Sequence, residues 1–294
     1  GFVIITNPKD GSILAIAQAE NPGRSHENHR KNKAVVDPYE PGSTFKIVVY
    51  SAALSSGVHL NDTVDVTDGY LIVQGHKIRD SHPLKRRISY EEGIVHSSNI
   101  AAAKLGLRLG PRKLYEMARK YGIGTRTGIS IPGEGCGRLL PPGKWRPIRT
   151  ANVAMGQGVL VNGIQMALAY GAVANGGYLL APKLILGYES ENGFVKNEDP
   201  FIVRRVIDKK VADKLKEAFI KVIEDSVIGT GRYARIPGVI AAGKTGTGQK
   251  VDPKTGRYSW HKIIASFIGF FPAEDPEYLI YVVIDEPRRG RFGG

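Results

Sequence analysis

The chain contains 294 residues, of which 42% are hydrophobic and 23% charged, with 41 Lys+Arg against 28 Asp+Glu. This composition is sufficient for one large domain or two small ones, and it excludes a disordered, collagen-like or disulfide-scaffold chain. The net charge of +13 favours anionic surroundings such as nucleic acid, phospholipid headgroups or an anionic polymer, with a merely soluble basic surface as the alternative. The single cysteine, Cys136, excludes an internal disulfide.

Both ends of the chain are expected to form β-strands. Residues 2–6 and 13–17 are short apolar runs around a Pro- and Gly-containing turn, which predicts a β-hairpin. Residues 239–247, 261–270 and 278–284 are also rich in β-forming residues, with a hairpin turn predicted at 251–257. The sequence contains no run of 18 apolar residues, its first residues are expected to form a strand and not a signal peptide, and its ends suggest a fragment of a longer protein.

The region between these strands is expected to be mostly helical. Residues 21–36 are polar and basic and predict a loop, after which apolar residues recur at helical spacing from Gly42 to Gly57. The clearest later helix is predicted to start at Asp208, with an apolar face that continues to Ile223. The sequence therefore predicts an α+β fold, with one antiparallel sheet built from both chain ends and flanked by helices.

The segment Ser43-Thr44-Phe45-Lys46 opens the first predicted helix and is the first candidate for chemistry. A spacing of three places Ser43 and Lys46 on one helical face, with Cβ atoms about 5–6 Å apart. The helix dipole favours a developing alkoxide, and burial can lower the lysine pKa until the neutral amine accepts the serine proton. In isolation, a helix cap followed by a solvated lysine gives the same pattern.

Two further segments carry polar residues at predicted structural junctions. Ser97-Ser98-Asn99 precedes a helical stretch, where it is either a helix cap or a hydroxyl relay beside a substrate-binding amide. Lys244-Thr245-Gly246-Thr247 follows an apolar strand, where the lysine either protects a sheet edge or faces a carboxylate-bearing ligand.

The three segments occur in order, 54 and 147 residues apart (97 minus 43 and 244 minus 97). Together they form the set found in penicillin-binding proteins and serine β-lactamases. The chain resembles the transpeptidase domain of a class B penicillin-binding protein of the cell-division (septal) type. Further stretches that are similar to that family are Glu40-Pro41-Gly42-Ser43, Arg79-Asp80-Ser81-His82, Gly156-Gln157-Gly158, Ala242-Gly243-Lys244-Thr245-Gly246-Thr247, Asp285-Glu286-Pro287 and Phe292-Gly293-Gly294.

The resemblance implies a single transpeptidase domain over residues 1–294 with the penicillin-binding-protein/serine β-lactamase fold. Its sheet subdomain would comprise residues 1–55 and about 236–294, and its mostly helical subdomain about 56–235. The membrane anchor and N-terminal pedestal of the class, and its C-terminal helix, are expected to be missing from this chain. The same resemblance places the domain on the extracytoplasmic (periplasmic) face of the bacterial cytoplasmic membrane, anchored by that missing N-terminal segment.

Site roles also follow from the resemblance. Ser43 would attack the penultimate D-Ala carbonyl of a stem peptide with Lys46 as general base, and the N–H groups of Ser43 and Thr247 would form the oxyanion hole. Ser97, held by Lys244, would pass the proton to the leaving D-Ala, and Asn99 would bind the peptide amide. Thr245, Gly246 and Thr247 would bind the terminal carboxylate, which is also the position of a β-lactam carboxylate. The implied partners are stem peptides ending in D-Ala-D-Ala, β-lactams and division-complex membrane proteins; no nucleic acid, metal or organic cofactor is required.

Several other assignments compete with this one. Residues 238–245 satisfy the phosphate-loop pattern G-x-x-x-x-G-K-T, but their middle is expected to be a strand and no helix can follow. A second K-T-G at Lys254 lies in a predicted turn, and the pair His26 and His29 lies in a polar loop without a third ligand. Trp145 and Cys136 are predicted to be packing residues.

Three alternatives remain within or near the same fold. A serine β-lactamase needs a group that activates water, and no E-x-x-L-N segment lies between the second and third motifs. A β-lactam sensor domain would need only acylation without turnover. A binding or scaffold module would need Ser43 to be unreactive.

Overall fold

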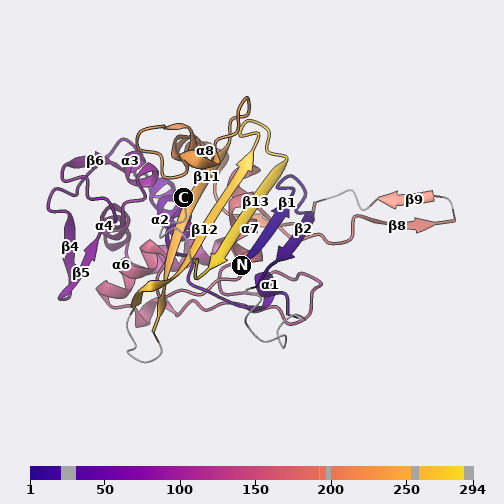
Figure 1. Ribbon diagram of the computed structural model, residues 1–294, viewed down its shortest axis with the longest axis horizontal. Helices are drawn as coiled ribbons and strands as arrows, with labels where there is room; N and C mark the ends of the chain where they lie inside the picture. The colour runs from indigo at the N-terminus through magenta and orange to yellow at the C-terminus, as the bar shows by residue number, and fades with distance from the viewer. Residues whose placement is uncertain (21–30, 192, 197–199, 253–257, 288–294) are drawn as a thin grey trace.

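The computed structural model describes residues 1–20, 31–191, 193–196, 200–252 and 258–287. Its centre is a five-stranded sheet in the order β11-β12-β13-β1-β2, and every neighbouring pair is antiparallel. The strands are β1 (Phe2–Thr6), β2 (Ile13–Gln18), β11 (Ala242–Val251), β12 (Tyr258–Phe271) and β13 (Tyr278–Asp285). The two chain ends therefore share one sheet, as the sequence predicts, because β1 pairs directly with β13 (Figure 1).

The register of the sheet defines its inner face. Ile4 is opposite Tyr281, Tyr281 is opposite Ile268, and Ile268 is opposite Lys244. All four side chains are buried, although the fourth is a lysine. Since side chains alternate between the two faces of a strand, this row places the Lys244 amine on the side of the sheet that faces the helices.

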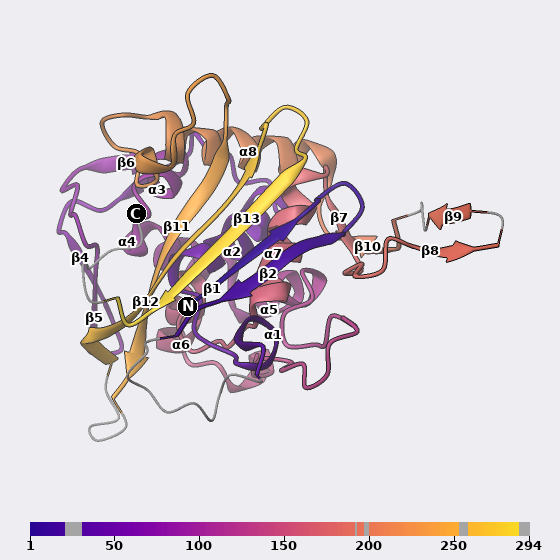
Figure 2. The same cartoon turned by 45° about the vertical axis from the view of Figure 1, so that its right-hand side comes forward.

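Helices α7 (Gly163–Ala174) and α8 (Lys209–Glu224) cover the inner face and lie behind the sheet in Figure 2. Every residue of α7 is buried, which agrees with its apolar composition on all sides. Helix α8 starts after Asp208 and buries one face, with Leu215, Phe219 and Val222 against the core. The remaining helices are α1 (Lys33–Val36), α2 (Lys46–Ser55), α3 (Tyr90–Val95), α4 (Asn99–Leu109), α5 (Pro111–Lys120) and α6 (Pro147–Met155), with 3-10 helices η2 (Gly42–Phe45), η3 (Pro142–Lys144) and η4 (Arg232–Ala234).

The middle of the chain also contains two-stranded sheets that the sequence analysis did not predict. They pair β3 (Thr63–Asp65) with β6 (Arg87–Ser89), β4 (Tyr70–Val73) with β5 (His76–Arg79), β7 (Tyr178–Leu180) with β10 (Ile202–Arg205), and β8 (Gly187–Ser190) with β9 (Gly193–Lys196). Strands of three or four residues are too short to show an alternating pattern. The β8–β9 hairpin projects away from the body in Figures 1 and 2.

Other boundaries differ in detail from the prediction. The loop expected over residues 21–36 contains the short helix α1, and its residues 21–30 are outside the described part of the chain. The strand expected from residue 239 begins at Ala242. Among the described residues, no helix combines the length and hydrophobicity needed to cross a bilayer.

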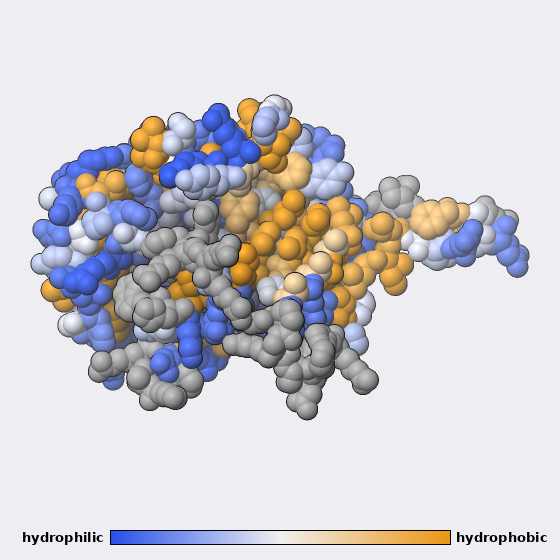
Figure 3. Space-filling model, in the orientation of Figure 1, coloured by the Kyte–Doolittle hydropathy of each residue, from blue (hydrophilic) through white to orange (hydrophobic). Residues whose placement is uncertain are grey.

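The outer face of the sheet carries apolar side chains at its surface (Figure 3). Leu14 of β2, and Tyr278 and Ile284 of β13, are each more than 40% exposed.

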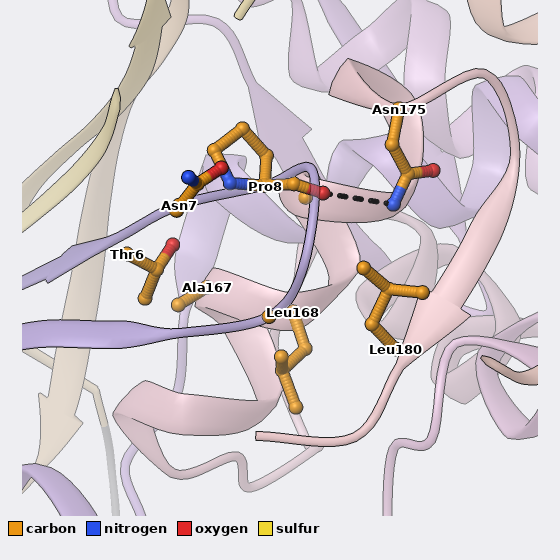
Figure 4. A pocket seen from close by; sticks show the side chains of 9 residues that line it. Thr6, Asn7, Pro8, Ala167, Leu168, Asn175 and Leu180 are labelled. Atoms are coloured by element: carbon orange, nitrogen blue, oxygen red, sulfur yellow. Dashed lines mark hydrogen bonds between the residues drawn. The ribbon is translucent and has the colours of Figure 1, made fainter. Parts of the chain in front are cut away.

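The turn between β1 and β2 packs on α7 beside a small, largely apolar pocket (Figure 4). The Asn175 side chain, which follows α7, donates to Pro8 O at 3.1 Å in this region. None of the predicted site residues lines this pocket.

Candidate active site

The nucleophile candidate Ser43 lies in the 3-10 helix η2 and not in the first turn of an α-helix. Helix α2 begins only at Lys46, so the sequence prediction of a helix starting at Ser43 is corrected by one turn. Ser43 and Lys46 still lie on the same face, because residues three apart are eclipsed in a 3-10 helix. Ser43 is partly exposed, whereas Lys46 is 1% exposed. A hydroxyl that a ligand can reach therefore lies three residues before a buried amine.

Close backbone packing holds the turn that carries Ser43. Gly42 has a φ of +56° and donates its N–H to Gly156 O at 3.1 Å, and a Cβ at Gly42 would lie 2.4 Å from Thr247 O. Gly156 has a φ of +87°, and a Cβ there would lie 1.9 Å from Gly42 O. Glycine is therefore required at both positions, and the turn is wedged between strand β11 and the end of α6.

The amine of Lys46 is anchored in the second motif. Its Nζ donates to Ser97 O at 2.5 Å, to Asn99 Oδ1 at 2.9 Å and to Ser97 Oγ at 3.3 Å. Burial lowers the pKa of Lys46 to about 7, and the charge of Asp80 opposes that shift. A neutral amine has two N–H groups and one lone pair, so donation to the two carbonyl-type oxygens leaves the lone pair for a hydroxyl proton. The arrangement can act as a general base near neutral pH.

The second motif sits at the junction of α3 and α4. Ser97 lies between the two helices with a φ of +58°, a strained conformation for a residue with a Cβ. Ser98 is the N-cap of α4, and its hydroxyl accepts from Ala101 N at 3.0 Å. Ser98 is therefore a helix cap, which is one of the two predictions for this segment. The side chains of Ser97 and Asn99 instead contact the Lys46 amine.

Asp80 organises this junction, a role that the motifs in the sequence did not predict. Its buried carboxylate accepts hydrogen bonds from Ser98 Oγ at 2.7 Å, from Ile100 N at 3.0 Å and from Asn99 N. A carboxylate at a helix N-terminus pairs with otherwise unsatisfied N–H groups and with the positive end of the dipole. The one available signal in the sequence was its presence in the family-like stretch Arg79-Asp80-Ser81-His82.

The third motif lies on β11, the edge strand of the main sheet. Lys244 is 1% exposed and its Nζ donates to Thr245 O at 3.1 Å. Burial, and secondarily the nearby charge of Lys46, hold the pKa of Lys244 well below its usual value. The two motif lysines, which are 198 residues apart in the chain (244 minus 46), are thus both buried, and the charge of one lowers the pKa of the other.

The hydroxyl of Thr245 is connected to the helical region through Thr230. Thr245 Oγ1 donates to Thr230 Oγ1 at 3.1 Å, and Thr230 Oγ1 donates to Val95 O at 3.2 Å at the end of α3. Thr230 thus joins the third motif to the element that leads into the second. Gly246 and Thr247 continue β11 toward Gly42, where Gly246 is buried opposite Ser266 and Thr247 is partly exposed. No local sequence pattern distinguishes Thr230, so its role could not be predicted from the sequence.

The competing assignments are resolved by the same geometry. The residues that would form a phosphate loop, Val239 to Ala241, precede β11, and Lys244 lies inside that strand. The next described element is the strand β12 and not a helix, so the segment does not form a phosphate-binding loop. Trp145 is buried and donates to Leu140 O at 2.9 Å, so it is a packing residue as predicted. Cys136 is exposed, so its predicted packing role is wrong. His26, His29 and the second K-T-G at Lys254 fall outside the described residues.

Comparison with known proteins agrees with the site. The sequence matches the family described as "Penicillin binding protein transpeptidase domain" over residues 1–294. The chain belongs to this family. Among curated relatives, it is 36% identical over 307 residues to stage V sporulation protein D of Bacillus subtilis, covering 100% of this chain and 46% of the relative. It is 35% identical over 303 residues to the probable peptidoglycan D,D-transpeptidase PbpC of Pseudomonas aeruginosa, covering 100% and 51%.

Solved structures of penicillin-binding proteins have the same fold. Penicillin-binding protein 3 of Mycobacterium tuberculosis, in complex with aztreonam, matches with a TM-score of 0.87 and 31% identity over 99% of this chain and 68% of that one. The transpeptidase domain of penicillin-binding protein 3 from Burkholderia pseudomallei matches with a TM-score of 0.86 and 29% identity, covering 100% and 82%. The resemblance to class B transpeptidase domains and the α+β fold are thereby confirmed. The chain spans about half the length of the curated relatives quoted above.

Proposed function

We propose that this chain is the catalytic domain of a peptidoglycan D,D-transpeptidase, which cross-links stem peptides ending in D-Ala-D-Ala through an acyl-enzyme on Ser43. The observation that carries the proposal is the buried amine of Lys46, which has a pKa of about 7 and is anchored on Ser97 and Asn99. Such an amine is partly neutral at physiological pH, as a general base for a serine requires. The function follows that of relatives named peptidoglycan D,D-transpeptidases.

Acylation begins with attack of Ser43 Oγ on the carbonyl of the penultimate D-Ala, while Lys46 accepts the hydroxyl proton. The new C–O bond gives a tetrahedral intermediate, whose oxyanion is stabilised by the backbone N–H groups of Ser43 and Thr247. Each such donor contributes roughly 10²–10³-fold to the rate. The C–N bond then breaks, and the terminal D-Ala leaves after its amine receives a proton through Ser97, which Lys244 keeps in place electrostatically.

Deacylation forms the cross-link. The amine of a second stem peptide attacks the ester carbonyl, a new amide bond forms, and the C–O bond to Ser43 breaks. The attacking amine loses one proton to Lys46 or Ser97, and Ser43 regains one as it leaves. Over acylation and deacylation together, every proton that is removed is returned, and no electron is transferred, so these two steps need no metal or organic cofactor.

Asn99 has enough hydrogen-bonding capacity for its proposed contact with the peptide amide. Its Oδ1 accepts from Lys46 at 2.9 Å and its Nδ2 donates to Arg79 O at 3.0 Å. An amide oxygen has two lone pairs and an amide nitrogen two N–H groups, so one acceptor site and one donor remain. Asn99 would therefore bind substrate without releasing the general base.

The terminal carboxylate of the substrate, or that of a β-lactam, would bind at Thr245 and Thr247 on β11. Successive strand residues point to opposite faces, so residues two apart present their hydroxyls on one side. Gly246 between them packs closely, since a Cβ there would lie 2.4 Å from Ser266 Oγ. Among the strands that the structure describes, β11 pairs with β12 alone and is an edge of the sheet. An edge strand can pair with an extended peptide main chain, and the Ser43 turn, which packs against Thr247 O, would lie beside such a peptide.

The cellular setting is also a proposal. We assign the domain to septal wall synthesis on the extracytoplasmic face of the membrane, anchored by an N-terminal segment and working with division-complex membrane proteins. Supporting names among its relatives and neighbours are penicillin-binding protein 3 and stage V sporulation protein D. The net charge of +13 suits anionic lipid or cell-wall precursors. Binding to anionic vesicles that does not weaken with added salt would contradict this electrostatic part.

The test of the proposed function is intact-mass spectrometry of the chain after incubation with benzylpenicillin. We expect one stable adduct on the wild type and on Ser55→Ala, an exposed serine at the end of α2, and none on Ser43→Ala. A parallel assay with pentapeptide donor and an acceptor amine should give cross-linked product and free D-Ala. Rapid return to the unmodified mass with hydrolysed drug would identify a β-lactamase, and an adduct without any cross-linking would identify a sensor domain.

A further inference from the structure

The turn that carries Ser43 lacks the usual local support. Neither Pro41, the N-cap of η2, nor Phe45, the N-cap of α2, makes a side-chain capping hydrogen bond. No acidic residue lies in the first turn of either helix. Uncapped helix starts leave main-chain groups that must be satisfied by tertiary contacts. The position of Ser43 is consequently determined by groups that come from elsewhere in the chain.

Tyr170 supplies such a contact from beneath the turn. Its hydroxyl donates to Thr44 O at 2.8 Å, and both residues are fully buried. Thr44 directly follows Ser43, so the accepting carbonyl is part of the same 3-10 helix. Burial holds the pKa of Tyr170 well above its usual value, and the hydroxyl therefore remains a donor over the whole working range of pH.

The Tyr170 ring is itself held in place by the core. It lies on α7, which is buried along its whole length, and it stacks on Phe219 of α8 with ring centroids 5.4 Å apart and an interplanar angle of 22°. Two packed helices thus fix the hydroxyl, and the hydroxyl fixes Thr44 O. The Thr44 side chain is tied in turn to Pro41 O at 2.9 Å, at the start of the turn.

We propose that Tyr170 is a positioning residue for acylation, and that its hydroxyl holds the Ser43 turn at the distance from Lys46 that proton transfer requires. The inference rests on the proposed function, since its readout is acylation of Ser43. A displacement of about 1 Å in a reacting group can lower a rate about 10²-fold. Tyr170 does not reach the substrate, so it should affect the acylation step and not the initial binding of a β-lactam.

Tyr121 offers a matched control within the same core. Its hydroxyl is fully buried and shares a hydrogen bond of 2.7 Å with Ser51 Oγ on α2, two turns beyond Ser43. Tyr121→Phe and Tyr170→Phe therefore remove the same buried group and weaken contacts to the same part of the fold. Only Tyr170→Phe removes a contact to the turn that carries the nucleophile.

The experiment is stopped-flow acylation by a chromogenic cephalosporin, which separates the pre-acylation dissociation constant from the acylation rate constant, together with thermal melting. We expect Tyr170→Phe to lower the rate constant by about tenfold or more, with an unchanged dissociation constant and an unchanged pH midpoint. Tyr121→Phe should stay within about twofold of the wild type, and the two variants should melt within a few degrees of each other.

Three results would overturn the inference. Equal acylation rates in Tyr170→Phe and Tyr121→Phe would show that Tyr170 has only a structural role. An upward shift of the pH midpoint in Tyr170→Phe would show the same, because it indicates that water has entered around Lys46. If Tyr170→Phe does not fold, Phe219→Leu keeps the hydroxyl but loosens its support, and an acylation rate equal to that of the wild type would then count against the inference. Absence of acylation in the wild type contradicts the proposed function itself, so the two failures are distinguishable.

Discussion

Lys46 Nζ lies 2.9 Å from Asn99 Oδ1, so the amine that would activate the nucleophile is held by a residue 53 positions further along the chain. Burial of this amine lowers its pKa to about 7. The reactive form is the neutral one, which becomes populated as the pH rises through that value. The rate constant for acylation by benzylpenicillin should therefore increase with pH from 5 to 8, with a midpoint near 7.

The measurement for this prediction is the pH profile of acylation on the wild type, followed by mass spectrometry on quenched samples. Lys46→Arg, which cannot lose its proton in this range, should remain unacylated at every pH. A wild-type profile that is flat between pH 5 and 8 would mean that another group accepts the proton.

Asp80→Asn should lower both the acylation rate and its pH midpoint. The change weakens the bonds to Ser98 Oγ and Ile100 N, which loosens the second motif, and we expect a rate loss of about 10- to 100-fold. The Asp80 charge also raises the pKa of Lys46, so its removal should move the midpoint below that of the wild type. The charge of Asp80 also affects the pKa values of His96 and Tyr50, and both residues are still present in this variant.

A matched control for this change is Asp68→Asn, an exposed aspartate in the turn before β4. It should leave both the rate and the midpoint unaltered. Thermal unfolding should report a loss of about 1.5–3 kcal/mol for Asp80→Asn, as expected for charge-assisted hydrogen bonds. A reduced acylation rate with an unchanged pH midpoint in Asp80→Asn would show that Asp80 has only a structural role.

Thr230→Val should strengthen recognition of the β-lactam carboxylate with little effect on the acylation rate constant. Thr245 Oγ1 donates its only proton to Thr230 Oγ1, which in turn donates to Val95 O. A carboxylate only accepts hydrogen bonds, so it must displace Thr230 before Thr245 can donate to it. Valine keeps the shape but removes this competing acceptor, and one hydrogen bond of about 1 kcal/mol corresponds to about a five-fold tighter pre-acylation complex. Thr230→Ser should bind like the wild type, and a weaker complex in the valine variant would show that Thr230 supports the site.

Gly156→Ala should destabilise the fold and slow acylation together. A Cβ at this position meets Gly42 O at 1.9 Å, and the φ of +87° is unfavourable for alanine. Relief of the clash must displace the turn that carries Ser43, at a cost of about 1–3 kcal/mol. Gly143→Ala is the control, because no atom lies within 4 Å of its Cβ position. Retention of the wild-type melting temperature and rate by Gly156→Ala would refute the proposed wedge.

The central sheet could be predicted because its strands are long and their patterns are local. Alternation and turn residues indicate β1, β2, β12 and β13 without any knowledge of their neighbours. The short strands β3 to β10 could not be predicted, since three or four residues do not establish a period. The strand start at Ala242, and not at residue 239, likewise depends on pairing with Phe270 of β12.

By itself the sequence determined the three motifs, their order and the family whose chemistry they resemble, because residue identity and spacing are local properties. Only the tertiary structure decided that Lys46 and Lys244 are both buried, since an isolated lysine is expected to be solvated. It also decided that Asp80, Thr230 and Tyr170 contact these motifs, through hydrogen bonds with residues 15 to 135 positions away. Burial, and with it the pKa of an amine, arises from packing between segments that the chain order does not place together.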